Sequence, residues 1–141
     1  MKHTYRLVDK IRNHRDLIVQ SELTHLDDDP PLVAVRYGSP SRVVRSAVKA
    51  ARARGLKVGA IRLKSLCPFQ DHLFERHRTH LVVELNLDGQ LVREVQRASG
   101  GEVHFLGRCG ELPAISELLN DFSDLIQGRP LARKPFEREA W

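Results

Sequence analysis

The protein has 141 residues, of which 41% are hydrophobic and 29% charged, and its formal net charge is +5. This size and composition are typical of one soluble globular domain, and no run of about 18 apolar residues is present that would span a membrane. The basic balance is compatible with an anionic ligand or an acidic partner. Aromatic residues make up only 6% and do not alternate with basic residues, which argues against a nucleic-acid-binding surface.

Cysteine usage and the N-terminus indicate a reduced, cytoplasmic protein. The two cysteines, Cys67 and Cys109, are too few for a disulfide framework, and neither belongs to a C-x-x-C pair. The N-terminal residues contain no apolar segment of the kind that directs secretion. We expect Cys67 to be buried because it precedes a proline in an apolar context, and Cys109 to be exposed in a glycine-containing loop.

Residues 1–31 are predicted to form a lead-in that packs on the core from outside. Residues 5–11 place apolar side chains on one helical face, and residues 17–19 form an apolar run short enough for an edge strand. Residues 27–31 then interrupt regular structure, because neither proline in this run can continue a helix. We expect the core over residues 32–128 and a charged tail over residues 129–141.

The core begins with a strand, a tight turn and a helix. Residues 32–37 (LVAVRY) are rich in apolar and β-branched residues, which favours a buried strand. Gly38 breaks the strand, Ser39 is expected to cap a helix over residues 40–54, and Pro40 suits the first helical position. Gly55 is a fitting stop for this helix.

The rest of the chain continues the alternation of strands and helices. Further strands are predicted over residues 58–63, 81–85 and 103–106. A short amphipathic segment is predicted over residues 69–76, a helix over residues 90–98, and a last helix between Pro113 and Gly128. This order of elements predicts an α/β fold with a mostly parallel sheet.

The turn after the first strand is a candidate ligand site. It places Gly38, Ser39, Ser41 and Arg42 at the positive end of a helix, where backbone N–H groups are able to hold an anion. Both serines are expected to act as helix caps, with anion binding as the alternative.

A second candidate turn follows the strand over residues 81–85. Its polar and turn-forming residues, Asn86, Gly89 and Gln90, lie where open α/β sheets bind ligands, beyond the carboxyl end of a strand. Asp88 as a helix cap and Gly89 as a turn former would explain this turn without any ligand.

One face of the helix over residues 40–54 is basic. Arg42, Arg45, Lys49 and Arg52 follow a 3-4-3 spacing, which places them on one side of the helix. A solvated face is the simpler interpretation. The alternative is that this face docks to an acidic subunit or a phosphate-bearing ligand.

No catalytic or metal-binding motif is present. The chain lacks G-x-S-x-G, a Walker loop, H-E-x-x-H and a dinucleotide fingerprint. His72, His77 and His80 lie near one another, but their spacing is neither that of a helical pair nor that of a zinc finger. We expect them to be surface histidines, and we expect neither catalytic residues nor metal ligands in this chain.

Three stretches taken together resemble a known family. YGSPSRVVRSAVKAARARGLKVGAIRLKSLCPF, VVELNLDGQLVREV and FLGRCGELPAISELL are similar, in order and spacing, to the C-terminal part of the α subunit of 2-oxoacid:ferredoxin oxidoreductases. The resemblance runs from about residue 16 to about residue 127. Cys109 departs from the family pattern in the loop that contains it.

The resemblance implies a transketolase C-terminal-like domain with three layers, α/β/α, and a mixed sheet of about five strands whose one antiparallel strand lies at an edge. It also implies an oxidoreductase complex that uses thiamine diphosphate, magnesium and iron–sulfur clusters to convert a 2-oxoacid to an acyl-CoA. This chain would be its non-catalytic assembly domain, with other domains or subunits as direct partners and ferredoxin and CoA as indirect ones. It would hold no cofactor itself. The alternative function is a stand-alone module that binds a phosphate-containing small ligand at residues 38–42.

Overall fold

The computed structural model describes residues 2–76 and 78–131, with side chains described from Thr4 onward. The elements follow the order α1 (Lys2–Arg12), α2 (Arg15–Ile18), β1 (Ser21–Thr24), β2 (Leu32–Tyr37), α3 (Pro40–Ala53), β3 (Val58–Leu63), the 3-10 turn η1 (Asp71–Leu73), β4 (Thr79–Glu84), α4 (Leu91–Ala98), β5 (Val103–Gly107) and α5 (Ile115–Ile126). None of the helices in these described ranges is long and apolar enough to cross a membrane.

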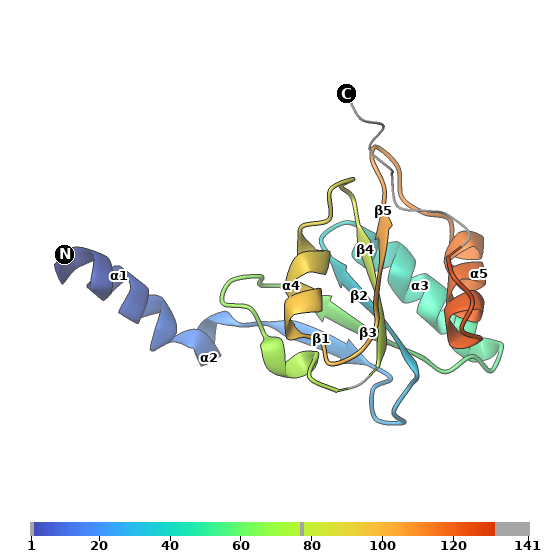
Figure 1. Ribbon diagram of the computed structural model, residues 1–141, viewed down its shortest axis with the longest axis horizontal. Coiled ribbons are helices and arrows are strands. Elements are labelled where there is room, and N and C mark those ends of the chain that lie inside the picture. Colours follow the sequence, from blue (N-terminus) through green and yellow to red (C-terminus); the bar gives the residue numbers. More distant parts are fainter. Residues whose placement is uncertain (1, 77, 132–141) are drawn as a thin grey trace.

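The strands form one mixed sheet of five strands in the order β1-β3-β2-β4-β5. β2 pairs in parallel with β3 and β4, β4 pairs in parallel with β5, and β1 is the antiparallel strand at one edge. α3 and α5 pack on one face, whereas α4 and η1 pack on the other. The predicted three-layer α/β fold is therefore confirmed (Figure 1).

The central strand β2 supplies side chains to both cores in strict alternation. Leu32 and Ala34 contact the layer of α3 and α5, while Val33 and Val35 contact the layer of α4. All four are fully buried, which explains why this strand reads as a continuous apolar run. The same alternation turns Arg36 toward the layer of α3, at the carboxyl end of the strand.

The lead-in differs from its prediction in two respects. Residues 17–19 were expected to form an edge strand, but Leu17 and Ile18 belong to the short helix α2, and the edge strand is β1. α1 does not pack on the core; it extends away from the sheet (Figure 1). The sheet explains the first difference, since β1 is the segment that pairs with the free edge of β3.

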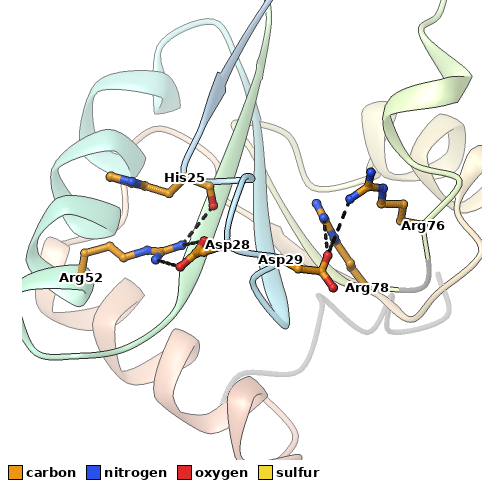
Figure 2. A network of polar contacts seen from close by, with 6 residues as sticks. All are labelled: His25, Asp28, Asp29, Arg52, Arg76 and Arg78. Carbon is orange, nitrogen blue, oxygen red and sulfur yellow. Dashed lines mark hydrogen bonds and ion pairs between the residues drawn. The ribbon is translucent and has the colours of Figure 1, made fainter.

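Asp28 and Asp29 connect the turn before β2 to other parts of the fold through hydrogen bonds. Arg52 of α3 donates hydrogen bonds to both carboxylate oxygens of Asp28 and to the backbone carbonyl of His25, and its Nε donates to the carbonyl of Val58. Asp29 accepts hydrogen bonds from Arg78, whose Nε lies 3.0 Å away (Figure 2). The acidic run that was expected only to interrupt regular structure therefore joins the lead-in to α3 and to the start of β4.

Candidate functional site

The two candidate turns meet at one edge of the sheet. β2 and β4 are neighbours, and the helices that follow them lie on opposite faces, so the point between their carboxyl ends is a topological switch point. A hollow of about 260 Å³ at this point is lined by Gly38 and Ser39 of the first turn and by Asn86 and Gln90 of the second. The tertiary structure thus brings together residues that are almost fifty positions apart in the sequence.

In the second turn, Glu84 at the end of β4 caps the start of α4. Its Oε2 accepts hydrogen bonds from the backbone N–H groups of Gln90 and Leu91, at 3.1 and 3.0 Å, and its Oε1 accepts one from Val92 at 2.8 Å. Asn86 donates to the same carboxylate at 2.7 Å. The buried carboxylate of Glu84 thus lies at the positive end of the helix, where a negative charge is stabilised.

The backbone N–H groups at the start of α4, which an anionic ligand would need as donors, already donate to side chains of the protein. The N–H of Gly89 donates to the side-chain oxygen of Asn86 at 2.6 Å, and the next three amides donate to Glu84. The amides at the start of α4 are therefore capped by Glu84, and the preceding amide by Asn86. Gly89 does have the turn-forming backbone that was predicted, with a φ of +67°.

In the first turn, the two serines do not act as caps. Ser39 has helical backbone angles, φ −62° and ψ −35°, and makes no side-chain cap hydrogen bond. An N-cap side chain needs an extended backbone to reach the first free amides, so this geometry prevents capping. The hydroxyl of Ser41 is buried and has no hydrogen-bond partner. The capping prediction is wrong for both serines, and Pro40 does begin the helix as expected.

A basic hollow of about 230 Å³ lies beside this turn. It is lined by Glu22, Arg36, Gly38, Ser39, Ser41, Arg42, Arg45 and Arg62. Strand register explains how residues from three strands meet here. Arg36 of β2 lies opposite Arg62 of β3, which lies opposite Glu22 of β1, and side chains in such a row point to the same face of a sheet.

Positive charge dominates this hollow. Burial, and then the charge of Arg62, lower the pKa of Arg36, which is only 2% exposed. Glu22 is the one acidic residue in the lining, and it is already paired with Lys64 at 2.6 Å and with Arg62 at 3.1 Å. These two cations hold the pKa of Glu22 at about 2. The carboxylate thus remains ionised at neutral pH.

The basic face of α3 divides into groups with different surroundings. Arg42 and Arg45 line the basic hollow, and Lys49 lines a neighbouring hollow of about 460 Å³. Arg52 donates hydrogen bonds to Asp28 and to backbone carbonyls. It therefore connects α3 to the turn before β2 and is not a free docking group. The interpretation of a uniform solvated face is therefore wrong for Arg52.

Two of the predictions about histidines and cysteines are also wrong. His80 is buried against Phe74, with Ser99 at 3.1 Å from its Nδ1, and burial lowers its pKa to about 4. Cys67 is exposed, although it was expected to be buried, and Cys109 is exposed as expected. His72 is exposed, and His77 lies outside the described residues. Within residues 2–76 and 78–131, no group of histidine, cysteine or acidic side chains has the arrangement of a metal site.

Sequence reasoning missed the two buried charges of this edge, Arg36 and Glu84. Each stands at or near the carboxyl end of a strand, directly after a run of buried apolar residues, in LVAVRY and in THLVVE. A charged residue inside or at the end of a buried run is the signal that would have found them, because buried charges need specific partners.

Comparison with known proteins gives a consistent assignment. The model of the family described as "Pyruvate:ferredoxin oxidoreductase core domain II" matches residues 31–116. The chain is 43% identical over 122 residues to 2-oxoglutarate synthase subunit KorA of Methanothermobacter marburgensis, covering 82% of this chain and 32% of that protein. It is 36% identical over 113 residues to ketoisovalerate oxidoreductase subunit VorB of Methanothermobacter thermautotrophicus, covering 71% of this chain and 32% of that protein.

A solved structure has the same fold. The chain superposes on 2-oxoglutarate:ferredoxin oxidoreductase from Magnetococcus marinus with a TM-score of 0.77 and 24% sequence identity, covering 89% of this chain and 23% of that one. That structure was determined with 2-oxoglutarate, coenzyme A and succinyl-CoA bound. The present chain spans about a third of the length of the KorA and VorB relatives.

Proposed function

Because the chain belongs to the pyruvate:ferredoxin oxidoreductase core domain II family, we propose that it is an assembly domain of a 2-oxoacid:ferredoxin oxidoreductase. The observation that carries this proposal is the 43% identity to a KorA subunit over most of the chain. The complete complex would convert a 2-oxoacid to an acyl-CoA and pass the electrons to ferredoxin. In this proposal the domain packs against the other domains and subunits and keeps them in register.

We assign the cofactors of that reaction to other parts of the complex. Thiamine diphosphate would supply the electron sink that stabilises the negative charge left when the 2-oxoacid loses carbon dioxide, and iron–sulfur clusters would carry electrons to ferredoxin. A cluster requires about four thiolates, whereas this chain has two cysteines, far apart in sequence. The residues present therefore do not fit a cluster, and we place no step of the reaction on them.

The first helix supports a role in assembly. Leu7, Val8 and Ile11 lie on one face of α1, and they are 66%, 41% and 46% exposed. An isolated helix of 11 residues is marginally stable in water, because its few hydrogen bonds barely offset the entropy of ordering it. An apolar stripe on a helix that extends from the sheet is thus best stabilised against another domain or subunit.

Co-expression tests the assembly proposal. The chain would be co-expressed with the chain that carries the thiamine-diphosphate-binding domains of such an enzyme, and the mixture analysed by size-exclusion chromatography. We expect one stable complex, and we expect Leu7→Glu/Ile11→Glu to weaken it. Leu87→Glu is the matched control, because Leu87 is an exposed apolar residue of the turn before α4. Separate elution of the two wild-type chains would contradict the proposal.

A further inference from the structure

We propose that the basic hollow beside the start of α3 binds the phosphate group of a small-molecule ligand. This inference is independent of the assembly role. It rests on one buried arginine, one buried hydroxyl and the cations around them, and on the shape of the surface beside them.

Arg36 is the centre of the site. The residue is 2% exposed; its Nη1 donates a hydrogen bond to the backbone carbonyl of Ser41 at 2.9 Å, and its Nε has no hydrogen-bond partner. A buried guanidinium is normally paired with a carboxylate or another anion, because an unpaired charge away from water is strongly unfavourable. Its hydrogen bond goes to a neutral carbonyl, and the nearby carboxylate of Glu22 is already paired with Arg62 and Lys64, so a bound anion would complete the environment of Arg36.

The neighbouring charges have the same sign as Arg36. Arg62 lies directly opposite it in the sheet, and Arg42 and Arg45 line the hollow from α3. Two cations in the first turns of a helix also act against the positive end of the helix dipole. The acidic residue of the lining, Glu22, is engaged by Arg62 and Lys64. An anion in the hollow would relieve all of these repulsions together.

The second buried group is the hydroxyl of Ser41. Ser41 is 6% exposed, lines the hollow, and its Oγ has no hydrogen-bond partner. The hollow therefore offers one hydroxyl and several guanidinium groups from two strands and a helix. A tetrahedral phosphate has oxygens that point in several directions and is able to accept from donors on different sides, whereas a carboxylate presents its two oxygens in one plane. This favours phosphate over carboxylate.

The surface beside the hollow has room for the rest of a ligand. A second hollow, of about 460 Å³, runs along α3 and is also lined by Arg36 and Arg45, together with Val48 and Lys49. Since the two hollows have these arginines in common, a ligand with its phosphate at Arg36 would extend along the helix. Lys49 would then contact a second negative charge if the ligand has one.

Calorimetric titration of the full chain with inorganic phosphate, at constant ionic strength maintained with chloride, tests the site. We expect saturable one-to-one binding of phosphate, and we expect pyrophosphate to bind with higher affinity than phosphate. Arg36→Met should weaken binding about tenfold or more, since it removes a charge-assisted contact at the centre of the site. Arg54→Ala is the control: it removes the same charge from the far, exposed end of α3 and should leave the affinity within about twofold.

Thermal unfolding supplies a second readout. Phosphate should raise the midpoint of the wild type and of Arg54→Ala by the same amount, and it should leave that of Arg36→Met unchanged. Should Arg36→Met fail to fold, Ser41→Ala/Arg42→Ala replaces it, with the same expected loss of binding. Absence of saturable binding, or equal weakening by Arg54→Ala, would overturn the proposal. Neither variant alters α1, so this outcome is separate from that of the co-expression test.

Discussion

The carboxylate of Glu84 at the end of β4 accepts a hydrogen bond from the backbone N–H of Val92, eight residues later, at 2.8 Å. Through this contact and its hydrogen bonds to Gln90 and Leu91, one side chain satisfies the amides at the start of α4. The strand and the helix of this crossover are thereby fixed to each other at the switch point of the sheet.

Replacement of this carboxylate should destabilise the protein. Glu84→Ala leaves three buried or half-buried amides without an acceptor, and we expect the free energy of unfolding to fall by about 2–3 kcal/mol. Glu84→Gln keeps one acceptor oxygen, so its free energy of unfolding should fall by less than that of Glu84→Ala. Urea denaturation measures both, with Glu94→Ala on the exposed side of α4 as a control that should change stability by less than about 0.5 kcal/mol. Equal effects of Glu84→Ala and Glu94→Ala would contradict the capping role.

Arg52→Ala should weaken the connection between α3 and the turn before β2. The variant removes hydrogen bonds to the carbonyls of His25 and Val58 as well as the pair with Asp28, and we expect a loss of about 1–2 kcal/mol by urea denaturation. Lys49→Ala, one turn earlier on the same helix, removes the same charge and should have little effect. Adding Asp28→Ala to Arg52→Ala should cost little more, because the two residues act together. Fully additive losses would argue against this connection.

His80 should make stability depend on pH. Its pKa is lowered from 6.5 to about 4 by burial and by the charge of Arg78, so the unfolded chain binds a proton before the folded chain does. Stability is therefore unaffected by this group above about pH 6.5 and falls between about pH 6.5 and 4, by a total of about 3 kcal/mol. The paired carboxylates add their own loss only below about pH 4.5, which leaves pH 5 to 6.5 as the window for His80.

Unfolding by urea at several pH values measures this dependence. We expect His80→Gln to flatten the curve between pH 5 and 6.5, whereas His72→Gln, at an exposed histidine, should leave its slope unchanged. An unchanged slope in His80→Gln would assign the dependence to other groups.

Both cysteines should react in the folded protein. Cys67 and Cys109 are exposed and unpaired with each other, so a thiol reagent should modify two thiols per chain without denaturant. Cys67→Ser and Cys109→Ser should each leave one reactive thiol. A thiol that reacts only after denaturation would show that its side chain is buried in solution.

Local sequence was sufficient to predict most of the elements, and for an identifiable reason. The strands over residues 32–37 and 58–63 agree with the structure at both ends, because a strand buried on two faces is a short run of apolar and β-branched residues between breakers. The helix over residues 40–54 ends within one residue of its prediction, and Gly55 adopts the positive φ of +80° that stops a helix. The ordered series of these segments also carried the resemblance to the family.

The local pattern did not determine the surroundings of single side chains. Cys67 and His80 were assigned the wrong exposure, since burial depends on which distant segments cover a residue. Ser39 has the composition of a cap without its backbone geometry, and Glu84 caps a helix from the strand before it. The hydrogen bonds of Glu84 join positions six to eight residues apart, and the preferences of adjacent residues do not predict such contacts.

The turn after β2 shows which features follow from local sequence and which depend on tertiary structure. The sequence by itself determined a strand, a glycine turn and a helix opened by Pro40, because each depends on backbone preferences of adjacent residues. Only the tertiary structure decided that Arg36 is buried there and that Arg62 lies opposite it, because sheet order and register come from long-range pairing. The charge of this hollow is the sum of residues from separate strands and a helix, and it exists only once they have been brought together.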